Sequence, residues 1–177
     1  HDEDPDVLEL FGEGELASIL INFPTPFPKK KRAPRRLTYL DRLMKYRLVL
    51  KDGGTVRMRT DSTPFRDFSL TQLELAGYKI EWETDDVRGM FPDEPWSGYE
   101  RKLVAKGAPV VGFCAVPEPA PEHVEQTAPL SLVSYLPEDL ESLDYIPFGM
   151  QGSIDNIVGY NANRRKKGLP DWRPPIV

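Results

Sequence analysis

The sequence predicts an α/β fold, because short apolar segments alternate along the chain with segments in which apolar residues recur every three to four positions. The first kind of segment is typical of strands and the second of helices. The expected strands are 16–23, 55–60, 78–83 and 109–116, and the expected helices between them are 38–49, 65–76 and 98–106. With 177 residues, of which 40% are hydrophobic, the chain is long enough to bury one sizeable core.

The first half of this pattern is a strand, a helix and a second strand. Segment 16–23 (LASILINF) is apolar and is ended by prolines, which predicts a buried strand of a parallel sheet. The helix that follows is expected to stop at Asp52-Gly53-Gly54, which should also form the turn into the next strand. That strand alternates apolar with basic residues (TVRMRT) and ends at Asp61, before turn-forming residues.

The second half repeats the alternation. Segment 65–76 has a broad apolar face and is followed by Gly77, a typical helix stop. Segment 78–83 alternates apolar and charged residues and predicts a strand with one drier face, and 84–95 is expected to be a polar loop. Segment 109–116 (PVVGFCAV) predicts a final buried strand.

The composition changes after Val116. Segment 117–129 is rich in proline and is interpreted as a linker or as an arm strapped to the domain. We therefore expect a domain at 1–116 and a C-terminal extension at 130–177 with helices at 136–143 and 153–165. In the second helix, Ser153 is the expected N-cap and Gly168 the stop.

Composition also excludes several classes of protein. The formal net charge of −5 argues against a protein that is basic throughout, and the single Cys114 excludes an internal disulfide. Two histidines do not by themselves make a typical zinc site, so no metal is expected. The sequence contains no apolar run of membrane-spanning length and no secretory signal pattern, which predicts a cytoplasmic protein.

The most informative segment is 21–37, INFPTPFPKKKRAPRRL. A strand runs into a proline-rich loop and then into six basic residues within eight positions. Ligands of open α/β sheets lie beyond the carboxyl ends of the strands, and a cationic loop there favours a ligand that carries phosphate. A solvated charge run would be the commoner interpretation of the basic residues alone, but the strand and the prolines favour a site.

Segment 16–116 resembles the bacterial tRNA (guanine-N7)-methyltransferase family. The family motif F-P-D-P-W-P-K-K-R-H corresponds to FPTPFPKKKR at 23–32, and RRL follows at 35–37. Further family motifs correspond, in order, to GG at 53–54, TD at 60–61, SGYE at 97–100 and GAPV at 107–110.

The resemblance implies transfer of a methyl group from S-adenosylmethionine to N7 of a guanine in the tRNA variable loop. It implies a Rossmann-like methyltransferase sheet, of which this chain carries the second half with flanking helices. The glycine-rich cofactor loop of such folds is absent, so the cofactor-binding residues are expected in a missing N-terminal half. We accordingly interpret the chain, which begins at His1, as a fragment that is inactive alone.

The resemblance also implies roles for individual residues. Asp61 and Glu100 could accept hydrogen bonds from the guanine N1 and N2 donors, and Ser97 could add a hydroxyl contact. The expected phosphate-binding residues are Lys29, Lys30, Arg32 and Arg35. Structural alternatives stay open for three of these: Asp61 could be a helix N-cap, and Ser97 with Glu100 could form a capping box.

Among the positions that depart from the family motif, Thr25 replaces an aspartate, Phe27 a tryptophan and Arg32 a histidine. Thr25 is the position of a carboxylate that the family uses at the substrate guanine, and a threonine keeps only a neutral hydroxyl. Two further hypotheses follow. The chain could be an RNA-binding protein of this fold without catalysis, or a structural fragment that self-associates through the sheet edge that the missing strands would leave exposed.

Overall fold

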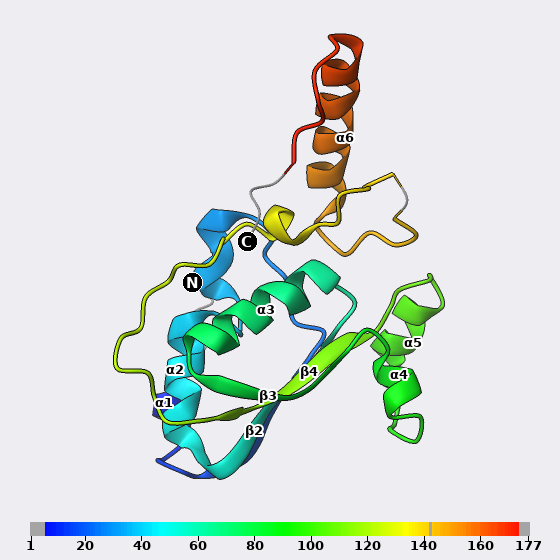
Figure 1. Ribbon diagram of the computed structural model, residues 1–177. Coiled ribbons are helices and arrows are strands. Elements are labelled where there is room, and N and C mark those ends of the chain that lie inside the picture. Colours follow the sequence, from blue (N-terminus) through cyan, green and yellow to red (C-terminus); the bar gives the residue numbers. More distant parts are fainter. Residues whose placement is uncertain (1–5, 142, 174–177) are drawn as a thin grey trace.

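A computed structural model describes residues 6–141 and 143–173 and contains a four-stranded mixed sheet. The strand order is β1-β2-β4-β3 (Figure 1). The strands are β1 (Leu16–Asn22), β2 (Leu50–Thr60), β3 (Tyr78–Thr84) and β4 (Val111–Pro117). β1 is parallel to β2, whereas β4 is antiparallel to both of its neighbours. The predicted α/β class and all four strands are therefore confirmed.

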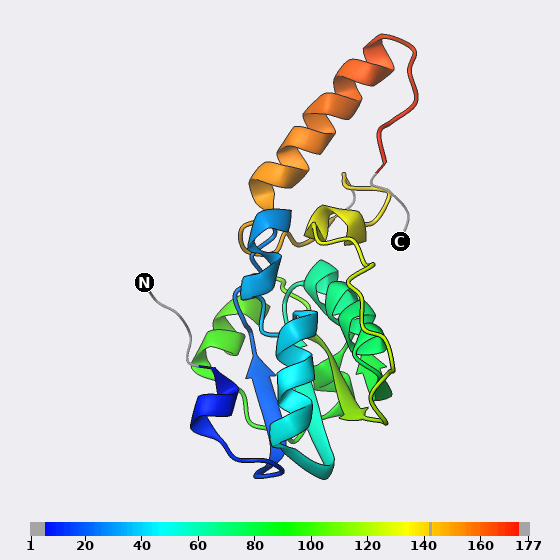
Figure 2. The same ribbon diagram turned by 90° about the vertical axis from the view of Figure 1, so that its left-hand side faces the viewer.

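Helices cover both faces of this sheet (Figure 2). The helices of the domain are α1 (Val7–Leu10), the 3-10 helix η1 (Lys30–Arg35), α2 (Leu40–Val49), α3 (Thr63–Leu75), α4 (Val87–Met90) and α5 (Gly98–Val104). Those of the extension are the 3-10 helix η2 (Leu132–Tyr135) and α6 (Gln151–Lys166). α2 and α3 lie on one face, and α4 and α5 lie on the other. The predicted polar loop 84–95 thus contains a short helix, α4.

The core lies between α3 and the sheet. Val56 and Met58 of β2 point to this face and pack with Phe65 and Phe68 of α3. α3 begins where it does because the hydroxyl of Ser62 accepts a hydrogen bond from the amide of Phe65. The alternation of β2 consequently leaves its two arginines on the opposite face, under α4 and α5.

β1 differs from the prediction of a buried strand. Ile21 alone is buried, and Leu20 is 64% exposed. In the described part of the chain, β1 pairs with β2 and with no other strand. A strand at the edge of a sheet has a neighbouring strand on one side only, whereas a central strand has one on each side. The apolar composition of β1 therefore overstates its burial.

The predicted stop and turn at Asp52-Gly53-Gly54 is wrong. α2 ends at Val49, β2 begins at the next residue, and the two glycines lie inside the strand. They form an irregularity in the pairing, which passes from Leu16↔Leu50 to Ser18↔Thr55. Gly53 has φ +71°, a conformation that glycine adopts without a steric cost.

Hydrogen bonds attach segment 117–129 to the domain. The guanidinium of Arg47 donates hydrogen bonds to the carbonyl oxygens of Ala76 and Glu118. The side-chain amides of Gln72 and Gln126 also bond to each other, at 2.6 and 3.1 Å. Of the two interpretations that the composition left open, the arm is therefore the one that the contacts support.

The helix predicted at 136–143 is wrong for the described residues of that segment, and residue 142 lies outside them. Leu136 is extended, with ψ 148°, because it precedes Pro137 and a residue before proline avoids the helical region. Leu136, Leu140 and Leu143 still pack against the core, but from turns rather than from one helix face.

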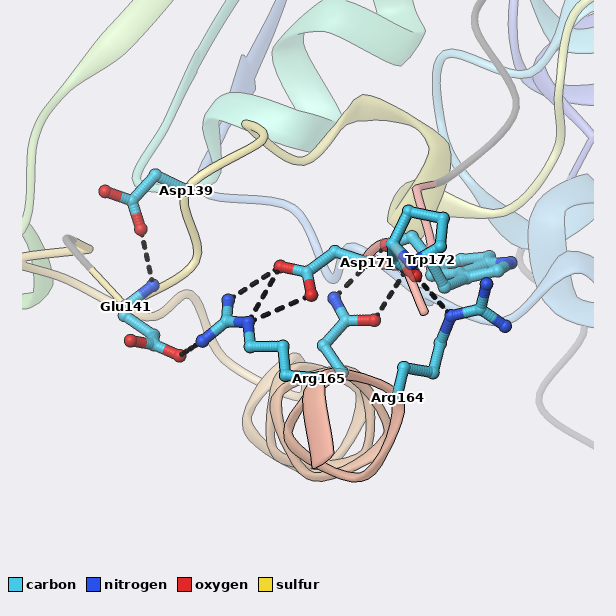
Figure 3. Close-up of polar contacts among 8 residues, drawn as sticks. Asp139, Glu141, Arg164, Arg165, Asp171 and Trp172 are labelled. Carbon is cyan, nitrogen blue, oxygen red and sulfur yellow. Dashed lines mark hydrogen bonds and ion pairs between the residues drawn. The ribbon is translucent and has the colours of Figure 1, made fainter. Parts of the chain in front are cut away.

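The predicted helix at 153–165 is confirmed as α6, although its N-cap position is Met150 and not Ser153. α6 projects away from the sheet, and the segment after it turns back along the helix (Figures 1 and 2). Figure 3 shows the contacts that hold this return segment: Arg165 binds Asp171 and Glu141, and Arg164 donates to the carbonyl of Pro170. Asn161 also pairs with the backbone of Trp172, at 2.7 and 3.2 Å.

Candidate functional site

The parallel strands β1 and β2 end at the same edge of the sheet. Asn22 is paired with Arg59, and the amide of Phe23 donates to the carbonyl of Arg59 at 2.8 Å. The loop that contains Thr25 and the turn that contains Asp61 therefore leave the sheet side by side. Thr25 and Asp61 thus follow neighbouring strands at one edge of the sheet, and each lines a different cavity.

The loop after β1 is rigid. It contains three prolines, and Phe23 and Phe27 both have positive φ, at 48° and 44°. The guanidinium of Arg36 is buried beneath it, donates to the carbonyls of Pro26 (3.0 Å) and Phe27 (2.8 Å), and stacks on Phe68. Burial lowers the pKa of Arg36 to about 10, which leaves the side chain cationic at neutral pH. Arg36 thus holds the loop from inside.

The other five cations of the basic run face solvent. We call them the basic lip, and they are Lys29, Lys30, Lys31, Arg32 and Arg35. None of the ion pairs found within residues 6–141 and 143–173 involves a member of the basic lip. Thr25 is exposed beside them. Such a cluster of exposed cations without carboxylate partners generates a positive potential that attracts an anionic ligand.

Asp61 is 8% exposed and accepts a hydrogen bond of 2.6 Å from the hydroxyl of Tyr145, which belongs to the extension. Burial, together with this bond to the carboxylate, raises the pKa of Tyr145, so the phenol stays protonated and remains the donor. A cavity of about 300 Å³ lies beside the pair, with Asp67 and Tyr135 in its wall. The alternative role of Asp61 as an N-cap is wrong, because Ser62 caps α3.

Ser97 and Glu100 lie at the start of α5. The hydroxyl of Ser97 accepts a hydrogen bond from the amide of Glu100 at 3.0 Å, which is the first arm of a capping box. The carboxylate of Glu100 is 1% exposed and binds the guanidinium of Arg88, while Arg59 lies 3.8 Å away. Tyr99 on the same helix packs edge-on against Phe23, with ring centroids 5.7 Å apart. α5 is thereby attached to the loop after β1.

Glu100 belongs to a larger set of charges that we call the arginine network: Arg57, Arg59, Arg88, Glu94 and Glu100. Burial tends to raise the pKa of Glu94, but hydrogen bonds from Arg57 and Arg59 outweigh it and lower that pKa.

Three aromatic rings enclose the network. Arg57 lies over Trp82 and Phe91, at 5.0 and 4.5 Å, and Arg88 lies over Trp96 at 4.5 Å. The sequence reasoning did not single out the network, although the alternation TVRMRT places both β2 arginines on one face.

A groove separates the basic lip from the start of α6. Its volume is about 310 Å³, and its lining includes Thr25, Lys29, Lys31 and Arg32 on one side and Phe148 and Ser153 on the other. The sequence reasoning missed Phe148 and Tyr145, both in the extension. The signal for them was the segment YIPFG at 145–149, in which a proline lies between two aromatic residues and a glycine follows.

The described residues do not fit a complete cofactor site. None of the described loops that lead from a strand to a helix is rich in glycine, whereas such a loop offers backbone N–H groups to the cofactor in folds of this kind. Within the described part of the chain, no group of three or more histidine, cysteine or acidic side chains could hold a metal ion. No helix in that part is long and apolar enough to cross a membrane.

Comparison with known proteins decides the family. Residues 2–113 match a family model described as "Putative methyltransferase". The chain belongs to this methyltransferase family. It is 36% identical over 107 residues to a tRNA (guanine-N(7)-)-methyltransferase of Halalkalibacterium halodurans, a match that covers 58% of this chain and 47% of that protein. It is 36% identical over 112 residues to the enzyme of the same name from Limosilactobacillus reuteri, covering 62% and 53%.

The resemblance to bacterial tRNA (guanine-N7)-methyltransferases is thus confirmed. The chain spans about half the length of these curated relatives. The family model ends at residue 113, so Tyr145, Phe148 and α6 lie outside the matched segment.

Proposed function

We propose that this chain is the substrate-side half of a tRNA (guanine-N7)-methyltransferase, which transfers a methyl group from S-adenosylmethionine to N7 of a guanine. The observation that carries the proposal is a shared sheet edge in a chain of this family: the basic lip follows β1 there and has no carboxylate partner among the described residues, and Asp61 follows the parallel strand β2. Among the described residues, no strand pairs with the outer edge of β1, and this supports the half-domain interpretation because such an edge offers hydrogen-bonding groups to a further strand.

Methyl transfer to guanine N7 requires little acid or base catalysis. Guanine N7 carries a lone pair and no proton before it attacks, so the enzyme mainly has to position the base and exclude water. We propose that Asp61 accepts hydrogen bonds from the guanine N1 and N2 donors. Tyr145 binds one oxygen of this carboxylate, and the adjacent cavity of about 300 Å³ gives access to Asp61 from the side.

Glu100 and Ser97 are proposed to act on the same base, directly or by holding α5. Because two arginines already surround the Glu100 carboxylate, a direct contact with guanine requires Arg88 to move. Holding α5, and with it Tyr99 against Phe23, requires no movement. We therefore favour the positioning role for both residues.

Lys29, Lys30, Arg32 and Arg35 are proposed to bind tRNA phosphates, the arginines through paired donors and the lysines as point charges. Thr25 would face the substrate with a neutral hydroxyl in place of the family carboxylate. S-adenosylmethionine would supply the methyl group. Its binding residues are proposed to lie in the part of the relatives that this chain does not span.

The test is methyl transfer from labelled S-adenosylmethionine to unmodified tRNA. We would compare this chain, a version extended to the length of its relatives, and Asp61→Asn in the extended version, with Asp52→Asn as the control for an exposed carboxylate. We expect activity in the extended protein, none in the chain alone, and at least a ten-fold loss on Asp61→Asn only. Equal activity of Asp61→Asn and Asp52→Asn would reject the role of Asp61.

A second candidate is an RNA-binding protein that has lost catalysis, and Thr25 is the observation that favours it. In that case the extended protein binds tRNA but transfers no methyl group, and Thr25→Asp restores transfer.

A third candidate is self-association through β1, favoured by the exposure of Leu20. Light scattering that shows a strict monomer at high concentration would exclude it.

A further inference from the structure

We propose that the groove between the basic lip and the start of α6 binds one unstacked nucleotide of an RNA strand, with Phe148 as the surface on which the base stacks. This inference takes its ligand class from the proposed function, but it does not depend on methyl transfer. It assigns a binding role to the C-terminal extension, which lies beyond the segment matched by the family.

The two walls of the groove have complementary properties. Lys29, Lys31 and Arg32 form a cationic wall, and no acidic residue is among the described residues that line the groove. The opposite wall carries Phe148, whose side chain is 74% exposed although it is large and apolar. Cations that track phosphates, facing an accessible aromatic ring, are the two elements with which proteins bind single-stranded nucleic acid.

The size of the groove limits the ligand. Its volume of about 310 Å³ is at the lower end of the range of about 300–1,000 Å³ found for small-ligand sites. A duplex does not enter a groove of this size, whereas one nucleotide turned out of a loop does. Sequence-specific recognition of RNA is directed mostly at such unstacked bases.

The walls are held together before any ligand binds. The carbonyl of Pro28 accepts hydrogen bonds from the amide of Leu132, at 3.1 Å, and from the guanidinium of Arg36, at 3.3 Å. Gly149 turns the chain at φ +78° against Pro28, where a Cβ atom would be 3.6 Å from the proline ring. Met150, which follows, is fully buried. A preformed groove avoids the entropic cost of ordering its walls on binding.

The test separates the base from the phosphates. We would measure the affinity of the full chain for a short single-stranded RNA and for an abasic strand with the same number of phosphates, by fluorescence anisotropy. The variants are Phe148→Ala, Phe148→Trp and, as a control phenylalanine that lines a different cavity, Phe11→Ala. A fourth variant, Lys31→Gln with Arg32→Gln, removes two phosphate contacts.

We expect Phe148→Ala to weaken RNA binding about ten-fold and to leave the abasic strand unaffected, because stacking is lost and charge is not. Phe148→Trp should retain binding, and Phe11→Ala should bind as the unmodified chain does. The Lys31→Gln, Arg32→Gln variant should bind both strands more weakly. Its slope of log affinity against log salt should be smaller by about 1.4.

Equal losses for RNA and the abasic strand on Phe148→Ala would overturn the proposal, and so would no loss for either. Tighter binding of an acidic peptide than of RNA would assign the groove to a different class of partner and would also overturn it. A negative methyl-transfer assay with these binding results intact would reject the proposed function alone.

Discussion

The arginine network and the basic lip both place cations near the carboxyl ends of β1 and β2, and they differ in what surrounds those cations. In the network, Glu94 and Glu100 form ion pairs with three arginines, two of which, Arg57 and Arg88, also lie over aromatic rings. In the basic lip, five cations face solvent without a carboxylate partner among the described residues. Partnered charges stabilise a fold, whereas a cluster that repels itself costs stability and is expected to serve a ligand.

The largest expected effect is that of replacing Arg36, because this residue belongs to the basic run but is buried. Arg36→Met should lower the free energy of unfolding by about 3 kcal/mol, since it leaves the carbonyls of Pro26 and Phe27 without their buried donor. The matched control is its neighbour, Arg35→Met, which should change stability by less than about 0.5 kcal/mol. Urea unfolding of both variants is the measurement, and equal effects would contradict the distinction.

The second effect concerns Glu94. Glu94→Gln should cost roughly 2 kcal/mol at pH 7, less than for a fully buried pair because the side chain is 27% exposed. The control is Glu81→Gln, an exposed partner of Lys79.

The pH dependence of this effect has a definite sign. The pKa of Glu94 is lowered in the folded state from an ordinary value of 4.5, so its stabilising contribution is present above that value and is lost as the pH falls through the folded pKa. The difference between wild type and Glu94→Gln should therefore shrink between pH 5 and pH 3. A difference that stays constant over this range would show that the Glu94 ion pairs do not contribute.

The third effect concerns RNA. Lys29→Gln with Lys30→Gln should weaken tRNA binding about ten-fold at low salt and should reduce the salt slope by about 1.8, as expected for two lost phosphate contacts. The control is Lys51→Gln with Lys79→Gln, two exposed lysines at the opposite end of the sheet. Equal losses in both pairs would mean that the protein binds RNA through its general charge rather than through the basic lip.

The smallest effect is that of the same Lys29→Gln, Lys30→Gln variant on stability. Because these side chains are exposed and unpaired, the melting temperature should stay within about 2 °C of wild type or rise slightly as repulsion is relieved. A decrease of 5 °C or more in a calorimetric scan would show that the basic lip has a structural role after all.

The local elements could be predicted from the sequence, and the contacts between distant segments could not. α3 follows from helical periodicity, which acts over a few residues, although its N-cap is Ser62 and not Asp61. The helix predicted at 136–143 is wrong, although apolar residues recur there at helical spacing, because Pro137 keeps Leu136 out of the helical region. The strand at 16–23 was placed correctly, but its burial was not, because burial depends on how many neighbours a strand has.

The candidate site could likewise be predicted only in part from the sequence. The sequence by itself determined that a rigid, cationic loop follows an apolar strand, because prolines restrict φ and six basic residues cannot be buried together. Only the tertiary structure decided which of those cations turns inward, and that Tyr145, 84 residues along the chain, donates a hydrogen bond to Asp61. Periodicity and turn chemistry are properties of neighbouring residues, whereas these contacts depend on how segments far apart in the chain pack together.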